Sequence, residues 1–293
     1  MPPAPEAPEA LVIGAGPAGL MAAEELAKAG VQVLVVEAKP TVARKFLMAG
    51  KSGLNVTKDE PWDTFATRYD TPRLRPILSA FGPMEVQDWC RALGHDVYTG
   101  SSGRVFPVEM KASPLLRSWL QRLITQGVEL RTRWRWAGFE GAAFRFDTPS
   151  GPQTLTPKVT ILALGGASWQ RLGSDGAWVP WLREKGVQIT PWRPANMGFR
   201  VEWSPHMAPF FGSPVKGIAL IAGPHRERGE FIISAKGVEG GGIYGIYKYL
   251  RDGLPLALDL LPDLAQDEIT RRIARMKPGE STANRLRKLG LDK

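Results

Sequence analysis

The sequence predicts an α/β fold that begins with a dinucleotide-binding β-α-β unit and continues into a second, mostly β domain. Three observations predict it. Residues 10–37 contain an apolar run, a glycine-rich turn, a stretch of small residues at helical spacing and a second apolar run. Short strand-like segments over 128–156 predict a β-meander, and a compact apolar strand follows over 158–164. Residues 187–260 are rich in Gly, Pro and β-forming residues.

The turn after the first strand, which we call the glycine turn, is Gly14-Ala15-Gly16-Pro17-Ala18-Gly19. Gly14 permits a tight turn, Gly16 lets the backbone approach a pyrophosphate, and Gly19 lets the helix pack closely on the strand. The helix N-terminus would present free N–H groups and the positive end of its dipole to phosphates. Glu37, which ends the second strand, can accept hydrogen bonds from ribose hydroxyls. This context favours a dinucleotide site over an ordinary strand-turn-helix.

Two helices are predicted between the β-α-β unit and the meander. Residues 38–70 lack a regular period and contain a loop rich in Gly, Lys and Asn. Residues 83–93 place apolar side chains on one helical face. Cys90 lies on that face, and we expect it to fill the core because no activating neighbour is evident in the sequence. The spacing over 112–126 predicts a second helix that stops at Gly127.

The domain boundary is predicted after residue 187. Residues 10–187 would form the nucleotide-binding domain, with a helix opening at 173–176 and running to about residue 185. Residues 188–293 would form the mostly β domain, with a helical pattern returning over 263–276.

Composition and charge restrict the class of protein. The single cysteine excludes an intrachain disulfide and favours a reducing compartment, so a cytoplasmic location is expected. No apolar run approaches the ~20 residues that span a bilayer, and residues 1–9 predict a short disordered lead. The net charge of +9 suits an anionic ligand but is explained equally well as solubilising surface charge. Arg and Trp alternate over 131–136, which predicts a half-exposed strand, so no nucleic-acid partner is expected.

Four further motifs carry a family resemblance. They are RKFLMAGKSGLNVT at 44–57, GRVFP at 103–107 followed by Lys111-Ala112, ALGGAS at 163–168, and GSDG at 173–176. They are similar to the RK(x)L…GGGRCN(V/L)T, GRxFP…KA, A(T/L)GGxS and GS…DG motifs of the BaiN/YhiN-like flavoproteins, also called aminoacetone-oxidase-like FAD-binding enzymes. Gly53-Leu54 stands where many relatives have Arg-Cys. The chain therefore resembles a separate branch of the family, without a thiol at that loop.

The resemblance implies a glutathione-reductase-type, Rossmann-like FAD-binding domain with the mostly β domain inserted into it. It implies FAD as the cofactor, with NAD(P)H as a transient reductant. The implied FAD-binding residues are Gly14, Gly16, Pro17, Ala18 and Gly19 at the pyrophosphate, Glu37 at the adenosine ribose, Arg44 and Lys45 along the ribose and phosphates, Gly50, Gly53 and Asn55 in the loop near the isoalloxazine, Gly165 and Gly166 close to the cofactor, and the backbone of Trp136 at the adenine.

Local chemistry leaves other interpretations open for several of these residues. Arg44 and Lys45 could be solvated loop charges, and Asn55 could cap a turn through its side chain. Gly50 and Gly53 could satisfy positive φ angles. No metal ligand and no acid–base residue is assigned, and we identify no second complete dinucleotide-binding turn.

Together these features predict an FAD-dependent oxidoreductase that is reduced by NAD(P)H and acts on an unknown small organic substrate. The family pattern also leads us to expect a terminal segment with GxxxAGE-like and GGY-like motifs, which the 293 residues do not contain. Its absence predicts weakened FAD binding. The alternative is a catalytically incomplete, truncated flavin-fold protein or a binding module without turnover. An NAD-dependent enzyme is disfavoured by the meander and the Gly-Gly strand.

Overall fold

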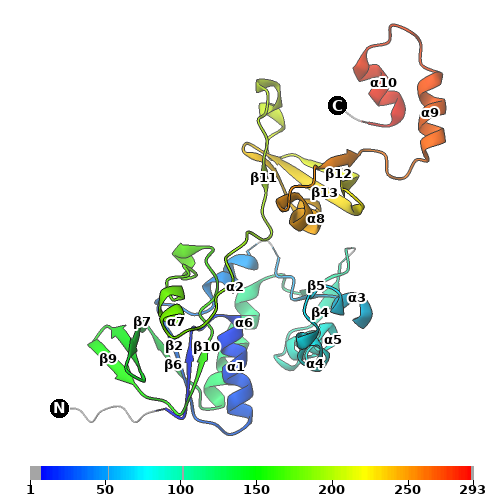
Figure 1. The fold of residues 1–293 in the computed structure, drawn as a ribbon. Helices are drawn as coiled ribbons and strands as arrows, with labels where there is room; N and C mark the ends of the chain where they lie inside the picture. The colour runs from blue at the N-terminus through cyan, green and yellow to red at the C-terminus, as the bar shows by residue number, and fades with distance from the viewer. Residues whose placement is uncertain (1–7, 52, 101, 292–293) are drawn as a thin grey trace. The chain divides into compact units, whose positions relative to one another are not determined.

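The computed structural model describes residues 8–51, 53–100 and 102–291. Its contacts divide the chain into two units, one up to Thr190 and one from Pro191 onward (Figure 1). Most of the predicted disordered lead lies outside the described residues. Each unit has its own core and is described by itself.

A four-stranded parallel sheet forms the centre of the first unit. Its strands are β1 (Ala10–Ile13), β2 (Val33–Glu37), β6 (Glu129–Thr132) and β10 (Val159–Leu162). The spatial order is β10-β1-β2-β6, so the chain runs outward from β1 through β2 to β6 and then returns to the other side of β1. This reversal makes the carboxyl ends of β1 and β10 the topological switch point, where doubly wound sheets bind their ligands.

One face of this sheet is covered by helices. Val12 and Val35 point into a core cluster that also contains Leu20 and Trp119. The covering helices are α1 (Pro17–Lys28), α5 (Pro83–Ala92) and α6 (Ala112–Thr125). The two helices predicted at 83–93 and 112–126 are confirmed. Cys90 is fully buried, as predicted, and burial raises the pKa of its thiol to about 11.

The opposite face is covered by the meander. Leu11 and Val36 pack there against Trp136 and Phe146, because alternate side chains of a strand point to opposite faces. The antiparallel strands are β7 (Arg135–Glu140), β8 (Ala143–Thr148) and β9 (Gly151–Leu155), with α7 (Val179–Glu184) beside them. Figure 1 shows β7 and β9 beside the parallel strands.

Two boundaries on this side differ from the prediction. The meander begins at Arg135, because the preceding strand β6 pairs in parallel with β2. Arg133 has a φ of +59° between β6 and β7, so the Arg–Trp alternation is not one continuous strand. Helix α7 begins at Val179, later than expected, because residues 173–178 are irregular, with turns at 173 and at 177–178.

Residues 38–70 contain more structure than predicted. Helix α2 (Arg44–Ala49), strand β3 (Thr57–Lys58) and helix α3 (Trp62–Ala66) occupy this stretch. Each is too short to give a recognisable apolar period, which is why the sequence pattern missed them. The following elements are the short helices η1 (Pro72–Leu74) and α4 (Arg75–Ala80), and the strands β4 (Val97–Thr99) and β5 (Arg104–Pro107), which complete a small antiparallel sheet with β3.

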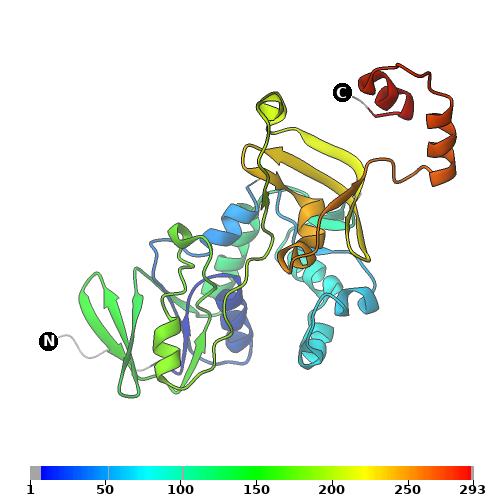
Figure 2. The same cartoon turned by 45° about the horizontal axis from the view of Figure 1, so that its top comes forward.

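The second unit is an antiparallel sheet with one packed helix. The strands, in spatial order, are β11 (Phe199–Arg200), β14 (Gly237–Glu239), β13 (His225–Ser234), β12 (Pro214–Ala222) and β15 (Ala257–Asp259). Helix α8 (Gly241–Arg251) packs Ile243 and Ile246 against Leu220 and Phe231. Figure 2 shows the helix against the strands of this sheet. Few helical signals were expected here, and α8 was missed because three glycines open it.

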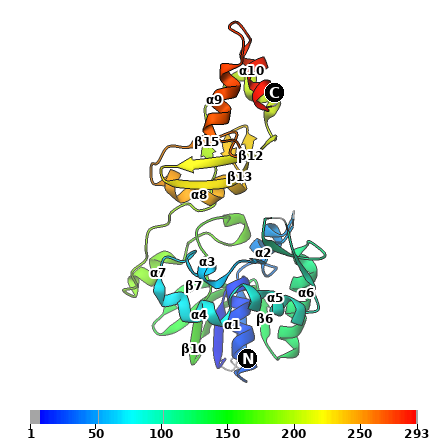
Figure 3. The same cartoon turned by 90° about the vertical axis from the view of Figure 1, so that its right-hand side faces the viewer.

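Further short and terminal helices complete the second unit. The short helix η3 (Pro205–Phe210) precedes β12. The helix predicted over 263–276 is α9 (Gln266–Ala274), and it contacts α10 (Thr282–Leu289) beyond β15 (Figure 3).

Candidate nucleotide-binding site

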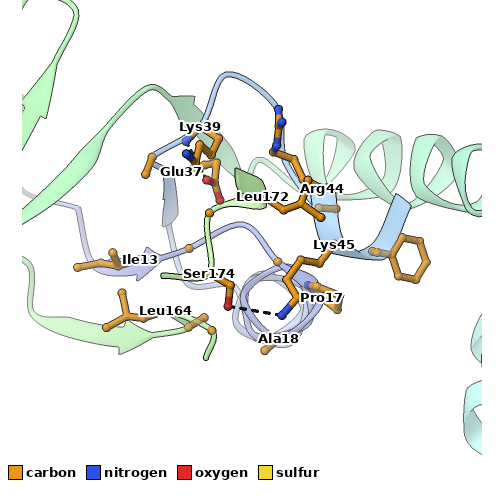
Figure 4. A pocket seen from close by; sticks show the side chains of 18 of the residues that line it. Ile13, Pro17, Ala18, Glu37, Lys39, Arg44, Lys45, Leu164, Leu172 and Ser174 are labelled. Atoms are coloured by element: carbon orange, nitrogen blue, oxygen red, sulfur yellow. Dashed lines mark hydrogen bonds between the residues drawn. The ribbon is translucent and has the colours of Figure 1, made fainter. Parts of the chain in front are cut away.

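A pocket of about 970 Å³ opens at the carboxyl ends of the parallel strands in the first unit. Ile13, Glu37 and Leu162, the last residues of β1, β2 and β10, all line it. The glycine turn leads from β1 into α1 among them, and Figure 4 shows lining side chains around the start of that helix. The pocket therefore lies at the switch point of the sheet.

The three positions of the glycine turn require glycine for different physical reasons. Gly14 has a φ of +107°, and a Cβ there would lie 2.3 Å from the carbonyl oxygen of Ala163. A Cβ on Gly19 would lie 1.9 Å from the carbonyl oxygen of Gly14. A Cβ on Gly16, which lines the pocket, would meet nothing within 4 Å. The tight turn and the close helix packing predicted for Gly14 and Gly19 are confirmed, and Gly16 leaves open space.

The N-terminus of α1 offers uncapped backbone donors to the pocket. The first backbone hydrogen bond of the helix runs from Leu20 N–H to the Gly16 carbonyl at 3.0 Å, and Pro17 has no N–H. No described side chain caps this end. Pro17 and Ala18 both line the pocket. Free N–H groups and the helix dipole together make this end a site for an anion.

Backbone donors fix the Glu37 carboxylate at the end of β2. Its Oε2 accepts the Ala15 N–H at 3.0 Å, and its Oε1 accepts the Lys39 N–H at 2.8 Å. A carboxylate can accept about four hydrogen bonds, so each oxygen retains capacity for a ligand hydroxyl. Glu37 is thereby tied to the glycine turn.

Arg44 and Lys45 are the first two residues of α2, not residues of a loop as expected. Lys45 Nζ donates to the backbone oxygen and Oγ of Ser168, both at 3.3 Å, and lies 3.5 Å from Ser174 Oγ (Figure 4). Lys45 is therefore bonded across the pocket rather than only solvated. Arg44 Nη1 donates to Thr41 Oγ1 at 3.2 Å, whereas its Nε is buried without a hydrogen-bond partner among the described residues.

The loop after α2 contains three of the expected residues. Asn55 lines the pocket. Gly53 has a φ of +137°. Gly50 has a φ of −87° and ends α2, where a Cβ would lie 2.5 Å from Ala112 Cβ. Gly50 is a contact between α2 and α6, and neither glycine lines the pocket.

The remaining expected residues lie around the end of β10 and in the meander. Gly165, with a φ of +71°, lines the pocket, whereas Gly166 does not and accepts a 2.9 Å hydrogen bond from Ser174 Oγ. Trp136 lines the pocket from β7, and its indole N–H donates to the Gly138 carbonyl at 2.8 Å. Its expected backbone contact with adenine stays a prediction.

Sequence reasoning missed two features of the pocket. Ser174 is buried and joins Lys45 to the Gly166 carbonyl, and its place in the GSDG motif was the signal for it. Trp89 and Trp119 also line the pocket from α5 and α6, although their spacing indicated only core packing.

The pattern G-x-G-x-x-G also occurs at residues 240–245, which the sequence analysis overlooked. Gly240 turns the chain with a φ of +109°. A Cβ on Gly242 would lie 2.8 Å from the Glu230 carbonyl oxygen, and one on Gly245 would lie 2.6 Å from Glu227 Cγ. These glycines let α8 pack on the antiparallel strand β13, so this segment is not a second dinucleotide-binding turn.

A Ser-His-Glu arrangement lies away from the residues that line the pocket. His95 Nδ1 is 3.0 Å from Glu109 Oε1, and its Nε2 is 2.9 Å from Ser118 Oγ. Ser118 lies inside α6, where backbone N–H groups are used by the helix and cannot form an oxyanion hole. The arrangement satisfies a buried imidazole rather than activating a nucleophile.

The described part of the chain lacks both a metal-binding cluster and a membrane-spanning helix. It contains no group of three or more His, Cys, Asp or Glu side chains placed to hold a metal ion. Nor does any of its helices combine the length and apolar character needed to cross a membrane.

Comparison with known proteins identifies a family and a curated relative. The family model described as the HI0933-like protein Rossmann domain matches residues 8–249. The 3-dehydro-bile acid delta(4,6)-reductase of Clostridium scindens is 26% identical over 271 residues. The alignment covers 88% of this chain and 66% of that protein, so the chain spans just under two-thirds of its relative's length.

Solved structures with similar architecture are more distant. The open conformation of a flavocytochrome c3 fumarate reductase aligns with 73% of this chain and 48% of its own at a TM-score of 0.47 and 17% identity. The 3-ketosteroid-delta4-(5alpha)-dehydrogenase of Rhodococcus jostii RHA1, solved with 4-androstene-3,17-dione, aligns with 54% of this chain and 46% of its own, at a TM-score of 0.41 and 15% identity. With both TM-scores below 0.5, these likenesses do not bear on activity or substrate.

Proposed function

The chain belongs to the HI0933-like Rossmann-domain family, and from this and the pocket we propose that it is an FAD-dependent oxidoreductase. The observation that carries the proposal is the glycine turn at the switch point of a parallel sheet, with Glu37 bonded to it. A dinucleotide site needs a strand, a tight turn and a helix N-terminus for the pyrophosphate, and an acidic residue at the end of the next strand for the ribose.

The residues present fit the ADP half of FAD. The uncapped N-terminus of α1 would hold the pyrophosphate. The pyrophosphate could approach the backbone closely because Gly16 has no Cβ and the space that a Cβ would fill is empty. Glu37 would accept the ribose hydroxyls. Lys45 and Arg44, which both line the pocket, would supply positive charge to the ribose and phosphates.

Bound FAD supplies hydride-transfer chemistry, and the protein binds, orients and shields it. Lys45 would keep α2 and the loop at residues 165–173 together across the cofactor. Trp134, Trp136 and Trp181 would keep water from the adenosine side. We further propose NAD(P)H as the reductant and a small organic substrate, in keeping with the reductase named for the Clostridium relative.

The test is an absorption spectrum of the purified chain before and after incubation with FAD. A retained flavin spectrum supports the proposal, and its anaerobic bleaching by NADPH or NADH supports reductase activity. A folded, colourless protein that cannot be reconstituted with FAD contradicts the proposal. Retained FAD that no nicotinamide reduces would contradict only the reductant.

A further inference from the structure

The pocket has a side that the nucleotide half of FAD does not need. We call it the helical wall. Its residues come from α1, α2, α5 and α6 or directly precede α5: Met21, Phe46, Phe81, Val86, Trp89 and Trp119. All of these side chains are hydrocarbon, thioether or indole. By contrast, Glu37 lies at the end of β2 and Ser174 in the loop before α7, and the Lys45 side chain reaches from α2 to Ser174.

The polar atoms of the helical wall are already used. The indole N–H groups of Trp119 and Trp89 both donate to Oε2 of Glu24, at 2.7 and 3.3 Å. Glu24 is fully buried in α1 and is also bound by Arg122 and Lys28, each at 3.1 Å. Because neither indole N–H is available to a ligand, the wall offers only apolar contact.

The aromatic rings of the wall hold one another at fixed angles. Trp89 and Trp119 meet edge to face, with centroids 4.8 Å apart and planes at 84°. Phe46 packs on Trp119 at 6.5 Å and 68°. Phe81 is 39% exposed, so the wall is open at that end. Trp119 is only 2% exposed, so the half-buried rings of Trp89 and Phe46 and the exposed ring of Phe81 are the ones open to a further ring in stacked or edge-to-face contact.

We propose that the helical wall binds an apolar ring that has no hydrogen-bonding group on the edge it inserts, and that this ring belongs to the substrate. The substrate assignment rests on the proposed function. The binding of an apolar ring to the wall does not. The benzenoid edge of a flavin is also an apolar ring edge and could occupy the wall instead. The experiment must therefore distinguish a substrate ring from the flavin.

The matched variants are Val86→Thr and Val108→Thr. Val86 lies half-buried in the wall, and threonine has nearly its shape but adds a hydroxyl that an apolar ring would leave unpaired. Val108 is 60% exposed and does not line the pocket. The probe is 2-naphthol, followed by ligand-observed NMR in the presence of saturating ADP to fill the nucleotide side.

We expect 2-naphthol to bind alongside ADP and to bind Val86→Thr roughly fivefold to tenfold more weakly than the parent chain. Val108→Thr should bind like the parent. Equal binding by both variants, or competition between ADP and 2-naphthol, overturns the helical wall as a ring site. Urea unfolding of each variant determines whether weaker binding of 2-naphthol by Val86→Thr reflects a loss of the fold.

The same titration on FAD-loaded protein identifies the source of the ring. If 2-naphthol still binds, the wall is free for substrate, as proposed. If FAD excludes it, the flavin occupies the wall and the substrate assignment is overturned. If FAD does not bind at all, the proposed function fails, and the ADP titrations still decide whether the wall binds a ring.

Discussion

The same substitution at two glycines of one turn should separate folding from binding. Alanine at Gly19 would place a Cβ 1.9 Å from the Gly14 carbonyl oxygen, whereas real contacts of this kind are essentially never closer than 3.0 Å. The start of α1 would have to move by about 1.1 Å to relieve that overlap. Alanine at Gly16 meets nothing within 4 Å, and its φ of −80° and ψ of 179° are open to any residue.

At each position, two competing effects set the change in the free energy of unfolding. Helix propensity alone would make Gly19→Ala more stable by about 1 kcal/mol. Overpacking against a backbone oxygen costs ~1–3 kcal/mol or more, and because the neighbour is backbone we expect a net loss of about 2 kcal/mol in the free energy of unfolding. At Gly16, the poorer helix cap and the lower entropy of the unfolded chain nearly cancel, leaving a change within ~0.5 kcal/mol.

Urea unfolding without ligand measures the first effect, and titration with ADP and FAD measures the second. Gly16→Ala should fold like the parent but bind both ligands at least tenfold more weakly, because its methyl group takes the space that a pyrophosphate needs. The reasoning is refuted if Gly16→Ala is destabilised as much as Gly19→Ala, or if it binds FAD with parental affinity.

Four other outcomes are expected. Burial raises the pKa of Glu24, but hydrogen bonds from its partners outweigh burial and hold the pKa below its ordinary value near 4.5. The stability that ionised Glu24 contributes is therefore complete above pH 4.5 and is lost as the pH falls through the lowered pKa. In urea unfolding, Glu24→Gln should cost about 2–3 kcal/mol at pH 7 and less at pH 3. Glu37→Ala should weaken FAD binding by about 1.5–3 kcal/mol in a titration, and unchanged affinity would remove its assigned role. Lys45→Met should weaken FAD binding and reduce its dependence on salt, while changing unfolding by less than ~1 kcal/mol because the side chain is exposed. Cys90, with a thiol pKa of about 11, should react with a disulfide reagent at pH 8 only in denaturant, and rapid reaction of the folded protein would show that α5 opens.

The sequence predicted those parts of the fold that local patterns dictate. The glycine turn, the strand ending at Glu37 and the helices at 83–93 and 112–126 all have apolar periods or glycines at fixed spacing. Helix α2 has no such period, so Arg44 and Lys45 were expected in a loop. The bond between Lys45 and Ser168 joins residues 123 positions apart, which no local pattern reveals.

Long-range pairing also explains the other differences. Strand β6 resembles a meander strand in sequence, and only its parallel partner β2 places it in the central sheet. Gly50 matched a family loop motif, although its close contact with Ala112 is a matter of helix packing. Close packing requires glycine at the start of α8. Glycine has a low helix propensity, so the sequence did not indicate a helix there.

The clustering of tryptophans around the pocket has an optical consequence. Six of the ten in the chain line it, namely Trp89, Trp119, Trp134, Trp136, Trp178 and Trp181. Most of the indoles that can contribute to the ultraviolet emission of the protein therefore lie beside the pocket. A chromophore that absorbs where indole emits, as flavins do, would quench that emission by energy transfer on entering. Occupancy could then be followed in unlabelled protein, and light absorbed by the chain would be passed to the bound chromophore.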